Sequence, residues 1–212
     1  MNRVIFLIDG FNLYHSVVDA STDLSGKSIK WLNIDSLCQS YMGIIDKKAT
    51  LNDIFYFSAL AHHRQLIDPD TVPRHKKYLK CLRALGIVYQ LSRFKPRETL
   101  CRNCHTKYIK HEEKETDVAI AAKLLEVLHL NKCDTIVLLT GDTDLAPAIK
   151  TAKTLFPKIT IVCLFPYKRH NDELAKLSHT HIKIKAETYT KHQLADPFEL
   201  PDGIKISKPP SW

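Results

Sequence analysis

Four aspartates stand where the sequence changes from one predicted element to the next: Asp9, Asp117, Asp142 and Asp144. Asp9 ends a nearly continuous apolar run, and Asp142 and Asp144 follow a second such run. Asp117 lies in the first turn of a long amphipathic segment. In a parallel α/β sheet these positions meet at the carboxyl edge of the strands, where ligands bind. Carboxylates gathered there repel one another unless a cation lies between them, so the sequence predicts a site for Mg²⁺ or Mn²⁺.

Each aspartate also has a purely structural interpretation. Asp144 is a good helix N-cap, Asp117 is favoured by the helix dipole, and Gly141 with Asp142 forms a common turn pair. Only the four acids together favour metal chemistry. A divalent ion held by such acids activates water and stabilises the charge that develops on a phosphodiester, as in nucleases.

The segments that must position these acids alternate between strands and helices. Apolar runs predict strands over residues 3–8, 53–60, 87–91, 134–139, 159–165 and 181–185. Helical periodicity predicts helices over residues 11–18, 33–42, 73–85, 115–130, 144–155 and 172–177. This alternation indicates an α/β fold, in which two layers of helices cover a mostly parallel central sheet.

Residues 92–114 interrupt the alternation with a basic stretch, which we expect to form a hairpin or a knuckle. Cys101 and Cys104, followed by His105 and His111, make half of a zinc-site pattern. A closed structural zinc site needs four ligands. Two interpretations therefore stay open, a small zinc knuckle and a hairpin with two reduced thiols.

The same insertion mixes cations with aromatic rings such as Phe94 and Tyr108, a pattern typical of RNA surfaces, where cations bind phosphates and rings stack on bases. The expected RNA-binding residues are Arg93, Arg97, Arg102, Lys107, Lys110 and Lys114. A second basic cluster, between His62 and Lys77, is an equal candidate.

Composition sets the wider frame. A chain of 212 residues with 44% hydrophobic residues suits one α/β domain, expected over residues 1–190 and followed by a tail over 191–212. The formal charge of +8 suits a polyanionic partner. The N-terminal apolar run is too short for a signal peptide or a membrane span, and four cysteines lie in apolar segments, so we expect a reducing cytoplasm and no membrane partner.

Three stretches of the sequence resemble the NYN family, a branch of the PIN-like ribonucleases: VIFLIDGFNLYHS, EEKETDVAIAAKLL and VLLTGDTDLAPAI. The resemblance covers residues 3–165. It implies a PIN-like α/β/α fold and RNA cleavage that depends on a divalent metal ion.

The motifs of the family fall on individual residues of this chain. Its Asp-Gly-x-Asn motif falls on Asp9, Gly10 and Asn12, which implies a metal ligand and an amide that orders the site. Its helix-start acid falls on Asp117, with Lys114 three residues before it. Its Ser/Thr-Gly-Asp-x-Asp motif falls on Thr140, Gly141, Asp142 and Asp144. The resemblance thus implies one catalytic set: Asp9, Asn12, Asp117, Asp142, Thr143 and Asp144.

The expected function is hydrolysis of single-stranded or structured RNA by a metal-dependent endonuclease. The alternative is a non-catalytic RNA-binding or regulatory protein that keeps the metal site, which an apolar, cation-poor rim around the acids would favour. The sequence has neither a Walker loop nor a GxGxxG motif, which argues against nucleotide-hydrolysing and dinucleotide-dependent enzymes. The oligomeric state is left open, a homodimer included.

Overall fold

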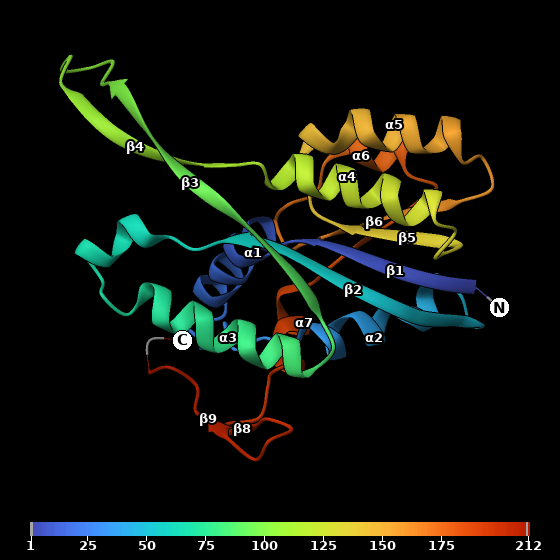
Figure 1. Ribbon diagram of the computed structural model, residues 1–212, viewed down its shortest axis with the longest axis horizontal. Helices are drawn as coiled ribbons and strands as arrows, with labels where there is room; N and C mark the ends of the chain where they lie inside the picture. The colour runs from blue at the N-terminus through green and yellow to red at the C-terminus, as the bar shows by residue number, and fades with distance from the viewer. Residues whose placement is uncertain (1, 211) are drawn as a thin grey trace.

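A seven-stranded sheet forms the centre of the computed structural model, which describes residues 2–210 and 212 (Figure 1). Its strands are β1 (Asn2–Asp9), β2 (Ala49–Ala59), β3 (Val88–Leu100), β4 (Lys107–Lys114), β5 (Thr135–Leu139), β6 (Thr160–Phe165) and β7 (Thr180–Lys183). Their order is β4-β3-β2-β1-β5-β6-β7, and every pairing except β3 with β4 is parallel. The predicted mostly parallel sheet is therefore confirmed.

Two hydrophobic cores lie on opposite faces of this sheet, and consecutive residues of β1 contribute to them in turn. Val4, Phe6 and Ile8 belong to one core, and Ile5 and Leu7 belong to the other. Such alternation follows from the period of two residues along a strand. A strand buried on both faces has to be apolar throughout, which is why β1 and β5 are visible in the sequence as continuous apolar runs.

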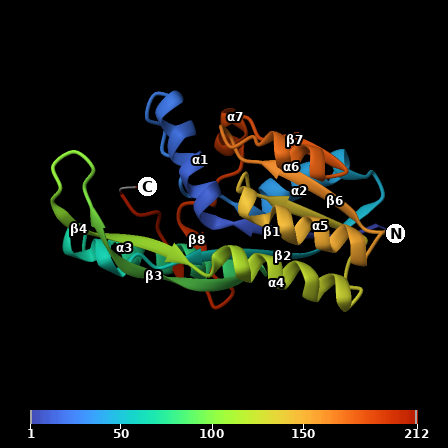
Figure 2. The same ribbon diagram turned by 90° about the horizontal axis from the view of Figure 1, so that it is seen from above.

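Helices cover both faces and complete a three-layer α/β/α fold (Figures 1 and 2). One layer contains α1 (Gly10–Asp23), α2 (Ile34–Ile45), α3 (Thr71–Ala84) and α7 (Ala186–Lys191). The other contains α4 (Thr116–His129), α5 (Ala146–Leu155) and α6 (Asp172–Leu177). The sequence did not indicate α7, and the helix expected from residue 144 starts with a 3-10 turn, η2 (Thr143–Leu145).

Local signals explain several helix ends. The side chain of Asn33 accepts a hydrogen bond from the amide of Ser36, so it caps α2 as predicted. Gly86 has a φ of +82° just beyond α3, a conformation that glycine adopts without strain. The four cysteines in apolar segments are buried and free: Cys38, Cys81, Cys133 and Cys163.

The strand order reverses between β1 and β5. From β1 the chain moves outward through β2 and β3, whereas from β5 it moves outward in the other direction through β6 and β7. The loops after β1 and β5 therefore diverge and leave a crevice at the carboxyl ends of these neighbouring strands. This switch point is where the fold offers room for a ligand.

The insertion over residues 92–114 is a hairpin of β3 and β4 that projects from the body of the molecule (Figures 1 and 2). Contacts between aromatic rings and histidine rings hold the base of the hairpin against α1 and η1. Phe94 of β3 meets Phe11 of α1 edge-on, with ring centroids 5.4 Å apart, and meets His63 of η1 (His62–Leu66) at 4.7 Å. His63 in turn stacks on His111 of β4 at 4.2 Å. The base of the hairpin is thus packed against the start of α1.

The C-terminal segment lies against the body of the protein. After α7 it forms a small antiparallel pair, β8 (Phe198–Glu199) with β9 (Lys205–Ile206), in which Ile206 is buried. The ring of Trp212 packs on Tyr78 and Trp31, at centroid distances of 5.3 and 6.0 Å. The division between a domain over 1–190 and a tail stays a prediction. Within the described residues, no helix has both the length and the apolar character needed to cross a membrane.

Candidate metal centre

Asp9 stands at the junction of β1 and α1. Its Oδ1 accepts hydrogen bonds from the amides of Phe11 (3.1 Å) and Asn12 (3.0 Å), so the carboxylate caps α1. The next residue has to be glycine, because a Cβ on Gly10 would lie 2.5 Å from the carbonyl oxygen of Phe57 in β2. The Asp-Gly pair thus turns the chain from strand to helix while β2 lies directly beside it.

The loop after β5 binds to the loop after β1 through two side chains. The hydroxyl of Thr140 donates to Oδ2 of Asp9 (3.0 Å) and accepts from the amide of Asp142 (3.1 Å). Oδ1 of Asn12 accepts from the amide of Gly141 (3.0 Å). These contacts fix Asp142 relative to Asp9. The catalytic ordering role of Asn12 stays a prediction.

Asp117 enters from the first turn of α4, just after the hairpin. Glu115 has a φ of +81° and turns the chain sharply between β4 and α4. A further acid, Glu113 of β4, lines the same pocket. Glu113 was not among the predicted site residues, although the alternation of side chains along β4 assigns it to the same hairpin face as Phe94.

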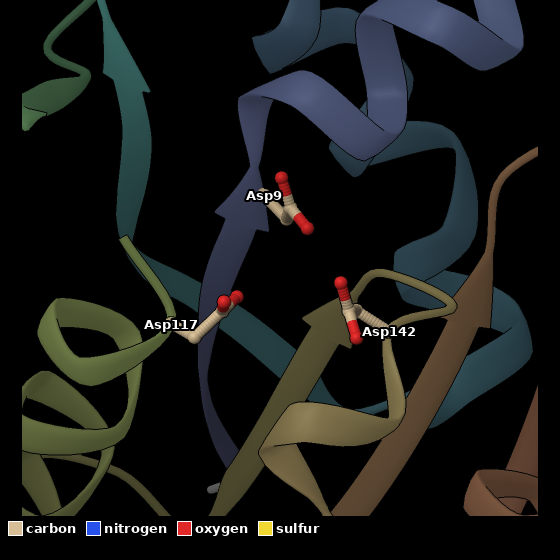
Figure 3. Close-up of side chains that lie close together, drawn as sticks. All are labelled: Asp9, Asp117 and Asp142. Carbon is tan, nitrogen blue, oxygen red and sulfur yellow. The ribbon is translucent and has the colours of Figure 1, made fainter. Parts of the chain in front are cut away.

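Three aspartates converge at the switch point (Figure 3). One carboxylate oxygen from each of Asp9, Asp117 and Asp142 lies within 4.8 Å of the others. They border a cavity of about 280 Å³, which is lined by Asp9, Phe11, Asn12, His15, Glu113, Asp117, Asp142 and Arg169.

The pKa values of these acids reflect burial and mutual repulsion. Burial raises the pKa of Asp117 to about 6, with further increases from the charges of Asp142, Asp9 and Asp144. Burial also raises the pKa of Asp9, although its hydrogen bonds from Asn12 and Thr140 oppose that shift. The pKa of Glu113 is raised by burial and by the charges of Asp117 and Asp142. The protein alone does not neutralise these charges, whereas a cation at this point would.

The sequence of the chain matches a known domain family over most of its length. The NYN domain family matches residues 3–185, which include Asp9, Asp117 and Asp142. The chain belongs to the NYN domain family. No curated protein sequence matches this NYN domain significantly.

Solved structures show how the NYN domain compares in fold. It resembles a protein of unknown function from Vibrio parahaemolyticus, with a TM-score of 0.56 and 14% identity over 87% of this chain and 93% of that one. A MurG structure from Acinetobacter baumannii aligns with 86% of this chain and 41% of its own, at 8% identity and a TM-score of 0.37. The first likeness supports a shared fold, and the second is too low to support an argument.

The donor set of this NYN domain fits a hard divalent cation. Its carboxylates come from three different elements, β1, α4 and the loop after β5, and reach one point. Oxygen ligands of this kind suit Mg²⁺ or Mn²⁺ better than Zn²⁺. The acidic cluster can therefore hold a divalent metal ion.

The remaining predicted site residues lie outside the group of three aspartates. Asp144 is exposed, and its backbone amide donates a hydrogen bond to Oδ1 of Asp142 (3.1 Å). The negative charge of Asp144 contributes to the raised pKa of Asp117. Thr143 opens η2 and does not line the cavity, whereas the hydroxyl of Thr140 donates to Asp9. The catalytic roles of Asp144 and Thr143 stay predictions.

Cys101 and Cys104 lie at the tip of the hairpin, between β3 and β4. Within the described part of the chain, Cys101 and Cys104 join no group of three or more ligand side chains. Hydrogen bonds with Thr106, and a further one with Cys101, lower the pKa of Cys104 to about 7. Of the two predicted alternatives, the structure has the hairpin with two free thiols.

Proposed function

We propose that this NYN domain is a divalent-metal-dependent ribonuclease that hydrolyses RNA phosphodiester bonds as an endonuclease. The observation that carries the proposal is the convergence of Asp9, Asp117 and Asp142 within 4.8 Å at the switch point. The pKa values of Asp9 and Asp117 are raised by burial and by repulsion between the acids. A cation bound between the acids would offset that repulsion and would be available for chemistry.

The residues of the site have two proposed roles, binding the metal ion and positioning the loops that carry its ligands. Asp9, Asp117 and Asp142 would hold Mg²⁺ or Mn²⁺, with Glu113 as a further carboxylate in the wall. The ion, when bound, supplies Lewis acidity that activates water and stabilises charge on the phosphodiester. Asn12 and Thr140 keep the two acid-bearing loops at a fixed distance, because each bridges from one loop to the other.

The hairpin supplies a surface suited to RNA. Residues directly opposite in an antiparallel pair share a face, so the register assigns one face to a set of five cations with Tyr108: Arg93, Lys95, Arg97, Lys110 and Lys114. Glu112 lies among them and pairs with Arg97, Lys110 and Lys114. Arg93 also pairs with Glu115. Five cations against two acids leave the face with a net positive charge, and Tyr108 offers an exposed ring for base stacking.

The second basic cluster is less suited to phosphates. Arg74 is paired with Asp68. Burial lowers the pKa of His75 to about 4, and burial together with His111 and Arg64 lowers the pKa of His63. These histidines are therefore neutral at pH 7, which favours the hairpin as the RNA surface. Arg102 and Lys107, which lie outside the five-cation face, stay predicted contacts.

The rim of the pocket favours catalysis over the non-catalytic alternative. It includes a guanidinium, that of Arg169, and the ring of His15 beside the polar Asn12. The feature expected of the non-catalytic alternative was an apolar, cation-poor rim around the acids, and this rim contains a cation and polar groups. The buried free thiols of the protein suit a reducing compartment such as the cytoplasm.

The test is cleavage of a linear single-stranded RNA, a hairpin RNA and a circular RNA, each with Mn²⁺, with Mg²⁺ and with EDTA. We expect cleavage only with metal, and cleavage of the circle would establish an endonuclease because a circle has no ends. Asp142→Asn removes a ligand charge without removing volume, so it should lower the rate about 100-fold or more with an unchanged circular dichroism spectrum. A folded wild type that binds Mn²⁺ and RNA but cleaves none of them would support the regulatory alternative instead.

A further inference from the structure

The loop that follows β6 brings a cation into the wall of the acidic pocket. Arg169 lies in this loop and lines the cavity together with Asp9, Asp117 and Asp142. Among the described residues that line the cavity, it is the only lysine or arginine. Neither the metal ligands nor the hairpin surface accounts for a guanidinium at this place.

Contacts of its backbone and neighbours hold this loop on the site. A Cβ on Gly141 would lie 1.9 Å from the carbonyl oxygen of Arg169, so the backbone of one loop rests directly on the other. The hydroxyl of Tyr167 donates to Oδ2 of Asp23 in α1 (2.8 Å), and the ammonium of Lys168 pairs with the same oxygen (2.5 Å). The loop therefore stays in place without the side chain of Arg169.

The guanidinium of Arg169 is bound by a carboxylate of α1 that does not line the cavity. Its Nη2 donates to Oδ2 of Asp19 in α1 (2.7 Å), and its Nη1 makes a long contact of 3.4 Å with the carbonyl of Lys168. Arg169 pairs with Asp19 and, within the described residues, with none of the pocket acids. A guanidinium has five N–H donors, so Asp19 fixes its orientation and leaves donors for a ligand.

Charge explains why an RNA phosphate needs such a group. The cavity contains four carboxylates, from Asp9, Glu113, Asp117 and Asp142, and one divalent ion balances only two of these charges. A phosphodiester carries a further negative charge and would be repelled by the remainder. The planar fork of arginine matches two phosphate oxygens, which makes it well suited to offset that repulsion.

We propose that Arg169, oriented by Asp19, binds a phosphate of the RNA backbone next to the acidic cluster. This inference rests on the proposed ribonuclease function and adds to it a residue that binds substrate and not metal. Arg169 would place the phosphodiester against the acids, while the hairpin binds more distant phosphates.

The test compares Arg169→Ala, Arg169→Lys and Asp19→Asn with Lys176→Ala as a matched control, which removes an exposed cation from α6, the helix that follows the loop. Three quantities are measured on the full chain: Mn²⁺ affinity by calorimetry, affinity for a labelled single-stranded oligoribonucleotide in Ca²⁺, and single-turnover cleavage in Mn²⁺. Arg169→Ala should weaken RNA binding about 10- to 100-fold, the range for a lost charge-assisted hydrogen bond, with unchanged Mn²⁺ affinity. Lys176→Ala should leave RNA binding close to wild type.

The two conservative variants separate binding from anchoring. Arg169→Lys keeps a cation for Asp19 but loses the fork, so it should fold like wild type and show an intermediate loss of RNA affinity. Asp19→Asn should weaken RNA binding less than Arg169→Ala and add little to it in the double variant, because both act through one guanidinium. Added guanidinium ion should restore part of the cleavage by Arg169→Ala and none of the cleavage by Asp142→Asn.

The outcomes keep this inference apart from the proposed function. If folded Arg169→Ala and Arg169→Lys bind and cleave RNA like wild type, the inference is wrong and the ribonuclease stands. If Arg169→Ala loses Mn²⁺ affinity and thermal stability while Arg169→Lys restores both and RNA binding completely, the role of Arg169 is structural and the inference is wrong. If wild type cleaves no RNA yet Arg169→Ala still weakens its metal-dependent RNA binding, the phosphate contact stands and the ribonuclease does not.

Discussion

Asp117 shows at the scale of one residue how a site can oppose the stability of its own fold. Its pKa is raised from 3.8 to about 6, chiefly by burial, so the folded protein favours the protonated form. For a carboxyl group with a raised pKa, ionisation lowers stability. The contribution of Asp117 to the metal-free protein is therefore most favourable below about pH 4 and is lost as the pH rises through about 6.

We predict that Asp117→Asn stabilises the metal-free protein at pH 7. Asparagine has nearly the same volume and no charge, and because the carboxyl group is only half-buried the gain should be about 1 kcal/mol, or about 2–4 °C in Tm. Thermal melts in EDTA measure it.

In saturating Mn²⁺ we expect wild type to have the higher Tm and Asp117→Asn the lower one. Saturating Mn²⁺ raises the Tm of any protein whose folded state binds it, and wild type should gain more than Asp117→Asn because it keeps all three carboxylates. Protons compete with the ion for Asp117, so the Mn²⁺ affinity of wild type should fall below about pH 6. A lower Tm for Asp117→Asn in EDTA at pH 7 would show that the carboxylate is structural.

At the scale of elements, the site depends on how two loops touch. The loop after β5 has no room for a side chain at residue 141, since the carbonyl of Arg169 occupies that space. We predict that Gly141→Ala lowers the free energy of unfolding by about 1–3 kcal/mol, the usual cost of overpacking. It should also weaken Mn²⁺ binding, because Asp142 is the next residue and has to move with the loop.

The same substitution in α2 is the matched control. Gly43 lies in an exposed part of this helix, and nothing lies within 4 Å of the position of an added Cβ. Gly43→Ala should raise the free energy of unfolding by up to about 1 kcal/mol through helix propensity. Chemical denaturation and Mn²⁺ titration of the two variants compare them directly, and equal effects at both positions would contradict the loop contact.

At the scale of the whole molecule, charge is distributed unevenly. The chain has a formal net charge of +8, yet the switch point is acidic and the projecting hairpin carries a basic face. The opposite face of the hairpin has Phe94 and Glu113, and its base packs against Phe11 at the pocket. Under the proposed function, an RNA bound to the basic face would lie on the opposite side of the hairpin from Glu113 and would reach the acids past the base of the hairpin.

We predict that replacing Lys95, Arg97 and Lys110 together by glutamine weakens RNA binding and makes it less sensitive to salt. Each lost phosphate contact on a single strand lowers the log-log salt slope by about 0.7, so the triple variant should lose about 2. The control removes three exposed lysines from the amino edge of the sheet, Lys47, Lys48 and Lys158, with the same change in net charge. Equal slopes for the two triple variants would mean that only net charge matters and that the hairpin is not the RNA surface.

Sequence alone determined the features that depend on local patterns. Continuous apolar runs marked β1 and β5 because a strand buried on both faces excludes polar residues. The acids at the ends of these runs had to meet, since parallel strands present their carboxyl ends at one edge. The alternation of strands and helices fixed the three-layer class, and Asp9, Asp117 and Asp142 could be chosen before any coordinates.

Only the tertiary structure decided which other side chains reach that edge. Glu113 joins through the register of a hairpin, and Arg169 joins because its loop packs on Gly141. Asp144, in an equally suggestive motif, faces solvent. Periodicity describes the order within one element, whereas contacts between loops depend on the packing of several elements at once, so no local pattern records them.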